Sequence, residues 1–111
     1  MNFFSLFKRN LLYKFKKKTN INFHENIDNS SLDKLFTLYN TDKANLVDNG
    51  TKQGHGFAEF YEKKLNLFRN KDKINILEIG SFSGASAAAF SKYFQNSQIY
   101  CLDINLLNFK F

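Results

Sequence analysis

The 111-residue sequence contains a single cysteine, no proline and no tryptophan. One cysteine cannot build a disulfide framework, and Cys101 does not belong to a cluster of cysteines and histidines at metal-ligand spacing. The sequence therefore predicts no structural disulfide and no metal site, and a reducing cytoplasm is the expected compartment. The abundance of Asn, Lys, Phe and Ile is typical of an AT-rich coding sequence, so composition alone says little about function.

Long apolar runs are also missing, because no uninterrupted apolar stretch exceeds four residues. A membrane-spanning helix needs about twenty, so the sequence predicts no transmembrane segment. A secretory signal peptide is excluded as well. The N-terminal positive charges follow the apolar residues instead of preceding them, and no small-residue cleavage site is present.

The excess of positive charge lies at the N-terminus. The net charge is +6, and residues 1–18 carry six basic residues and no acidic one, so the remainder is balanced. This distribution does not indicate a nucleic-acid-binding domain. Phe3, Phe7, Leu11 and Phe15 are spaced four apart, as on one face of a short helix. That helix either packs on the domain or makes a weak contact with an anionic membrane surface through residues 1–18.

Residues 30–73 read as mainly helical. Ser30 and Ser31 offer an N-cap, and the apolar residues from Leu32 to Tyr39 follow helical spacing. Residues 40–56 form a long polar stretch with three glycines, which predicts a loop, and loops of this length are often functional. Helical spacing resumes over residues 57–68.

The last third of the chain carries the signature of a β-α-β unit. The apolar run that begins at Ile74 predicts a strand covered on both faces. A glycine turn, an alanine-rich helix, a second apolar strand and then Asp103 follow it. Two strands are fewer than the roughly five or six of an ordinary sheet, so the sequence looks like the front part of a larger domain.

Candidate ligand-binding residues lie where these strands end. Gly80 permits a sharp turn and Gly84 a close backbone approach, and Ser81 and Phe82 lie between them in the same predicted site. Asp103 is positioned to accept hydrogen bonds from both hydroxyls of a ribose.

A further acidic residue, Glu78, falls inside the first apolar run. Because a buried carboxylate is unfavourable alone, it requires a cation, a set of donors or solvent, and a cationic ligand is one such partner.

Two phosphate-binding patterns are excluded. A dinucleotide fingerprint starting at Gly80 requires glycines at positions now held by Phe82 and Ala85. The chain also lacks the Gly-x-x-x-x-Gly-Lys-Ser/Thr pattern of a P-loop.

The pattern Glu-Ile-Gly-x-x-x-Gly at 78–84 instead resembles the first motif of class I S-adenosylmethionine-dependent methyltransferases, whose ligand carries a sulfonium and an ammonium group and no phosphate. Upstream, residues 35–43 (ending Thr-Asp-Lys), 54–57 (Gly-His-Gly-Phe) and 60–62 (Phe-Tyr-Glu) resemble the N-terminal region of macrolide and sugar O-methyltransferases. The resemblance spans about residues 30–105. It implies that these segments cap the cofactor, with Thr41, Asp42, Lys43, His55 and Tyr61 near its methionine end or the substrate mouth. The alternatives are a solvated pair for Asp42 and Lys43, a simple loop position for His55 and a core position for Tyr61, and for Tyr61 the core position is favoured.

The resemblance implies a truncated Rossmann-like α/β fold, with N-terminal helices followed by the first β-α-β of a parallel sheet. The predicted organisation is a basic arm and linker at 1–29, a helical cap region at 30–73 and an incomplete cofactor-binding domain at 74–111. The implied activity is O-methyl transfer to a small molecule or sugar, with the fragment inactive alone and its catalytic residues undefined. The alternatives are an accessory module that pairs with a chain carrying the missing half, or a membrane-surface protein led by the basic arm.

Overall fold

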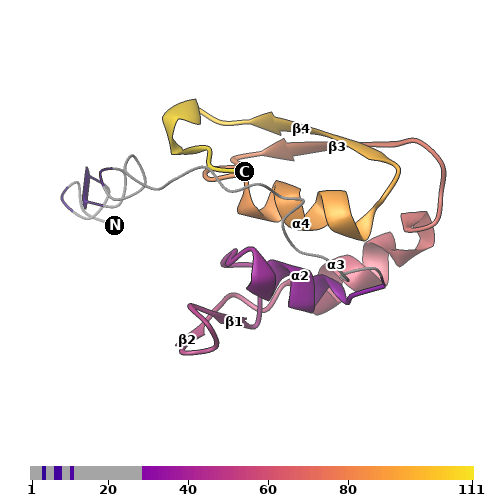
Figure 1. Ribbon diagram of the computed structural model, residues 1–111, viewed down its shortest axis with the longest axis horizontal. Helices are drawn as coiled ribbons and strands as arrows, with labels where there is room; N and C mark the ends of the chain where they lie inside the picture. The colour runs from indigo at the N-terminus through magenta and orange to yellow at the C-terminus, as the bar shows by residue number, and fades with distance from the viewer. Residues whose placement is uncertain (1–3, 5–6, 9–10, 12–28) are drawn as a thin grey trace.

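The computed structural model describes Phe4, Phe7, Lys8, Leu11 and residues 29–111. In this part of the chain the sheet of β3 and β4, the helix α4, and the pair α2 and α3 form successive layers (Figure 1). The expectations of an amphipathic helix at 3–15 and of membrane contact through 1–18 lie outside the described residues, apart from four exposed side chains. Within the part that is described, no helix is both long and apolar enough to span a membrane.

Helix α2 spans Leu32–Leu38, close to the predicted bounds. Ser31 is its N-cap, as predicted, because its side chain accepts a hydrogen bond from the Lys34 amide. Glu62, on α3, accepts the amide of Leu32 at 2.8 Å, so a second helix satisfies another donor of this helix start.

The predicted loop at 40–56 contains a short antiparallel hairpin instead of being irregular throughout. Strands β1 (Leu46–Val47) and β2 (Lys52–Gln53) pair across a tight turn. Four backbone hydrogen bonds then hold residues 42–45 beside residues 54–57. Gly54 is required there because a Cβ atom would lie 2.0 Å from the carbonyl oxygen of Ala44.

The second predicted helix is present as α3 (Ala58–Leu65), followed by the 3₁₀ turn η1 (Asn66–Phe68). Its buried residue is Ala58, whereas Phe60 is exposed. Tyr61 contacts the core instead, because its ring meets those of Phe36 and Phe90 edge-on at 6.1 and 5.6 Å. These three rings join α2, α3 and α4 in one hydrophobic core.

The β-α-β unit forms as predicted. Strand β3 (Ile74–Ile79) pairs in parallel with β4 (Ser97–Leu102), and α4 (Ala85–Tyr93) connects them. The alanines of α4 are buried, so the helix lies close against the sheet.

Only one face of this sheet is covered within the described residues, so the expectation of a strand covered on both faces is wrong for them. Burial alternates along β3 and β4, and the outward-facing Leu77 and Ile79 are 57% and 79% exposed. The apolar run arises because residues on both faces are apolar, whereas the described helices pack on a single face. The uncovered face is made of Leu77, Ile79, Tyr100 and Leu102.

Candidate functional site

The loop between β3 and α4 is shaped by residues with positive φ. Gly80 has φ +83° and Gly84, the N-cap of α4, has φ +82°. The amide of Gly84 closes the turn on the Ser81 carbonyl at 2.8 Å. No atom lies within 4 Å of where a Cβ on Gly80 would be, so the backbone here borders open space that a ligand can approach.

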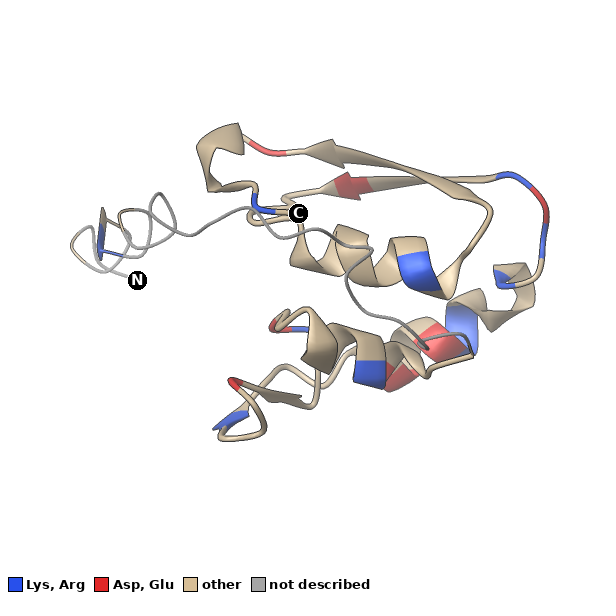
Figure 2. Cartoon of the chain, in the orientation of Figure 1, with Lys and Arg blue, Asp and Glu red and all other residues tan. Residues whose placement is uncertain are grey.

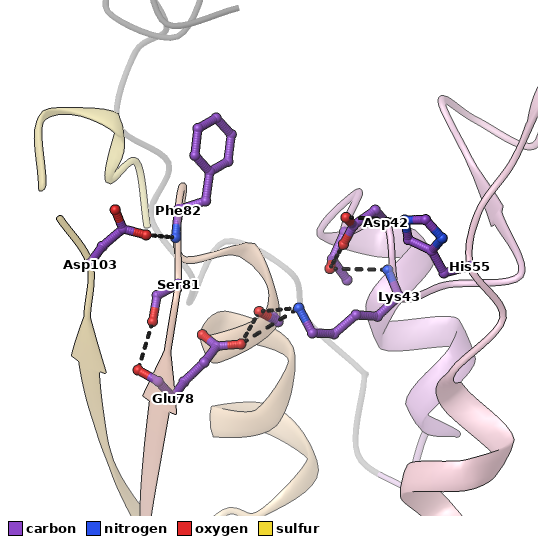
Figure 3. A network of polar contacts seen from close by, with 9 residues as sticks. Asp42, Lys43, His55, Glu78, Ser81, Phe82 and Asp103 are labelled. Atoms are coloured by element: carbon purple, nitrogen blue, oxygen red, sulfur yellow. Dashed lines mark hydrogen bonds and ion pairs between the residues drawn. The ribbon is translucent and has the colours of Figure 1, made fainter. Parts of the chain in front are cut away.

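Phe82 also has positive φ, +47°, although it is not glycine. Its amide donates to Oδ2 of Asp103 at 2.7 Å (Figure 3). The amide of Asn105 donates to Oδ1 of Asp103 at 2.9 Å. The Asn105 amide most strongly, and the amides of Phe82 and Ile104 with it, hold the pKa of Asp103 below its ordinary value because they stabilise the ionised carboxylate. Asp103 therefore fixes the loop and is ionised at neutral pH.

Acidic residues occupy the carboxyl end of both strands, Glu78 within β3 and Asp103 directly after β4 (Figure 2). The side chain of Glu78 faces α4 and is 11% exposed. Its Oε1 accepts a short hydrogen bond from the Ser86 hydroxyl and lies 3.7 Å from the Lys43 ammonium (Figure 3). Its Oε2 is buried and has no hydrogen-bond partner. The predicted need for a cation, donors or solvent is thus met at Oε1 by Lys43 and Ser86, but not at Oε2.

The predicted cap residues occupy different environments. Thr41 is buried, and its hydroxyl accepts the amide of Lys43 at 3.4 Å. Lys43 also donates from Nζ to the Ser86 hydroxyl at 3.3 Å, so it reaches across to α4. Asp42 and His55 are both exposed, and their side chains lie 3.7 Å apart.

One cleft collects most of the predicted site residues. It has a volume of about 1240 Å³, and its lining includes Thr41, Asp42, Lys43, Gly80, Ser81, Phe82 and Asp103. Tyr61 lies apart from it, in a second groove along β3 that Lys43 and Glu78 also line. His55 lines neither, and its ring stacks on Phe57. The structure therefore brings together the loop, Asp103 and the Thr-Asp-Lys segment, while Tyr61 packs in the core.

Three residues that shape the candidate site were not among the residues predicted from the sequence. Ser86 donates a hydrogen bond to Glu78. The sequence feature that could have identified it is its position in the first turn of the helix that follows the glycine loop. Asn105 anchors Asp103, and a polar residue two positions after a strand-end aspartate is a weak turn signal. Phe109 has no such signal: its ring lies 2.6 Å from where a Cβ on Gly84 would be.

Metal binding has no support in the described part of the chain, where no group of three or more His, Cys, Asp or Glu side chains could hold an ion. No family model, curated protein or solved structure matches the sequence. The function is therefore argued from the cleft itself.

Together the cleft and the adjoining groove, which share Lys43 and Gly80, suit a ligand with hydroxyl donors at the Asp103 end and a cation at the Glu78 end. Each carboxylate oxygen can accept two hydrogen bonds. The amides of Phe82 and Asn105 each donate to one oxygen of Asp103, and the Ile104 amide also interacts with the carboxylate, so acceptor capacity remains for a ligand hydroxyl. Glu78 has an oxygen with no donor at all. Two carboxylates at the strand ends disfavour a pyrophosphate in the same position.

Proposed function

We propose that residues 30–111 form the cofactor-binding part of a class I S-adenosylmethionine-dependent methyltransferase, a cytoplasmic enzyme that acts on an oxygen of a small molecule or sugar. The observation that carries the proposal is the Glu78 carboxylate oxygen, which is buried without a donor beside the glycine loop. A cationic ligand group in the groove that Glu78 lines would be attracted to this carboxylate. S-adenosylmethionine, when bound, supplies an electrophilic methyl group.

The residues of the cleft fit such a cofactor from both ends. Asp103 would hold the ribose hydroxyls, because its carboxylate is ionised and fixed by two backbone donors. The open space at Gly80 would admit the central part of the ligand against the backbone. Glu78 would face the cationic end. Because these groups are fixed before binding, the protein's contribution is to position the ligand.

Calorimetric titration of the purified 111-residue chain tests the proposal. We expect S-adenosylmethionine and S-adenosylhomocysteine to bind and the dinucleotide NAD not to bind. Asp103→Ala should weaken both adenosyl ligands by about ten- to a hundredfold, the range expected for lost hydrogen bonds to a charged group. Asp48→Ala is the matched control, because it removes one carboxylate from the same cleft.

Circular dichroism of both variants checks that the fold is retained, since Asp103 also anchors the loop. Binding of NAD in preference to the adenosyl ligands, or no binding of either by the wild-type chain, would contradict the proposal. Equal weakening by both aspartate variants would remove the assignment of Asp103.

A further inference from the structure

The uncovered face of the sheet is apolar and open to solvent. Its four side chains pair across the two strands, Leu77 with Tyr100 and Ile79 with Leu102, so they form one continuous surface. Paired strands lie about 4.8 Å apart, which brings these side chains into contact range of each other. A sheet face that stays in water usually carries polar residues at such positions, so this face has the composition of a surface that is buried.

Further exposed apolar residues follow directly after β4. Ile104 is fully exposed and lines the main cleft together with Leu102, so it borders the uncovered face. The 3₁₀ turn η2 (Leu106–Asn108) adds Leu106 and Leu107, which are both exposed. The apolar surface at this end of the sheet is therefore larger than the face of the two strands alone.

The area of this apolar surface matches what a stable dimer needs. A large aliphatic side chain carries on the order of 100 Å² of apolar surface, and all seven of these side chains are half exposed or more. They therefore leave roughly 500 Å² of apolar surface in contact with water. A standard interface buries about 800 Å² per partner, and about 65% of a homodimer interface is apolar, which is again about 500 Å².

The charge pattern favours a second copy of this chain as the partner. The outward-facing positions of β3 and β4 hold no charged residue, and the one charged residue of the two strands, Glu78, faces α4 (Figure 2). In a twofold-symmetric interface a surface meets its own copy, so any charge on it would meet a like charge. An anionic membrane surface is matched by lysines and arginines, and a charged partner protein by opposite charges. The face offers neither.

We propose that the uncovered face is the interface of a symmetric homodimer, in which two copies of the chain pack sheet against sheet. The two sheets would lie about 10 Å apart, as in other packings of this kind. The outer layers of the dimer are then the helices that already cover the opposite face of each sheet (Figure 1). A dimer of this kind does not depend on which ligand the cleft binds.

Sedimentation velocity of the purified 111-residue chain over about 1–100 µM tests the proposal. We expect an equilibrium between monomer and dimer with a micromolar Kd, the weak end for this interface area, because the face offers no ion pair. Ile79→Lys should raise the Kd by at least about a hundredfold, because each dimer would bury two unpaired charges. Leu102→Lys, on the other strand of the face, should act alike. Phe60→Lys is the matched control, because Phe60 is also exposed but lies on α3, in the layer away from the sheet.

Circular dichroism checks that the variants stay folded, which we expect because the replaced side chains are exposed. In the wild type, binding of a hydrophobic dye per chain should fall as the protein dimerises, because the face is then covered. Dimers that survive both Ile79→Lys and Leu102→Lys would place the interface elsewhere, such as the open strand edges, and overturn the proposal. A chain that stays monomeric over the whole range would also overturn it, and dye binding would then show whether the face is free or is covered by N-terminal residues of the same chain.

Discussion

Replacing Glu78 with glutamine should stabilise the ligand-free protein while impairing ligand binding. At 3.7 Å the attraction to Lys43 amounts to about 4 kcal/mol at an effective dielectric constant of 20. Desolvating the carboxylate, one oxygen of which is buried without a donor, opposes this attraction by several kcal/mol. The terms nearly cancel, so we expect Glu78→Gln to raise the free energy of unfolding by about 1 kcal/mol.

Removing the lysine of this ion pair should instead destabilise the ligand-free protein. Lys43→Met leaves the Glu78 charge buried without its partner, and we expect a loss of about 2–3 kcal/mol, below the 3–5 kcal/mol of fully buried pairs because Lys43 is partly exposed. For a domain of this size 1 kcal/mol corresponds to about 4–8 °C in Tm. Thermal unfolding followed by circular dichroism measures both variants, with the exposed Glu59→Gln on α3 as control.

The sign of the change in Tm caused by Glu78→Gln decides whether the carboxylate serves stability or ligand binding. If it lowers Tm as much as Lys43→Met does, the ion pair is stabilising and the carboxylate is explained by structure alone. If it raises Tm but abolishes the increase in Tm caused by S-adenosylhomocysteine, the carboxylate is retained for binding at the expense of stability.

Three further perturbations test other parts of the structure. Gly54→Ala should destabilise the protein more than Gly50→Ala, as measured by urea unfolding. A Cβ on Gly54 would lie 2.0 Å from a backbone carbonyl oxygen. A Cβ on Gly50 would meet open space, so only the backbone φ of +83° is unfavourable for alanine, at a cost of about 1–2 kcal/mol. Because backbone donors, that of Asn105 most strongly, lower the pKa of Asp103 in the folded state below its ordinary 3.8, its stabilising contribution should be complete above that pH and lost as the pH falls through the lower folded pKa. Asp103→Asn should remove this acid-dependent part of stability, as measured by acid unfolding. On the uncovered sheet face Leu77→Lys should reduce binding of a hydrophobic dye with little change in Tm, whereas Ile76→Lys on the core-facing side of the same strand should unfold the protein.

Most of the secondary structure could be predicted because local signals agree with the tertiary structure. Ser31 caps α2 through its own side chain, and the glycine loop starts α4 where its residues permit positive φ. These signals depend on neighbours within a few residues. The hairpin of β1 and β2 was missed because strands of two residues have no measurable alternation, and distant groups also hold it. Asp33 accepts the amide of Asn45, and Thr37 donates to the Leu46 carbonyl.

The covering of the sheet could not be derived from the apolar run of β3. Ile76 and Leu77 are both apolar, yet one contacts the core and the other is exposed. A strand's composition shows which faces can be buried, but the segments that pack on them lie elsewhere in the chain. The same limit applied to Glu78: the need for a cation followed from its position, but the choice of Lys43 depends on how the cap region packs on α4.

The main cleft at Asp103 and the adjoining groove at Glu78 are the two ends of the candidate site, and they differ in how fully their polar groups are satisfied. At the Asp103 end the residues after β4 fold back on the loop: the Lys110 amide donates to the Ser83 carbonyl at 2.9 Å, and the Phe109 ring contacts Gly84. A ligand therefore meets a loop that is already ordered, and binding there requires little rearrangement. At the Glu78 end an acceptor lacks its donor and the nearest cation is held loosely. A buried acceptor without a donor destabilises the ligand-free protein, so the Glu78 end has a cost of stability that the ordered loop at the Asp103 end does not have.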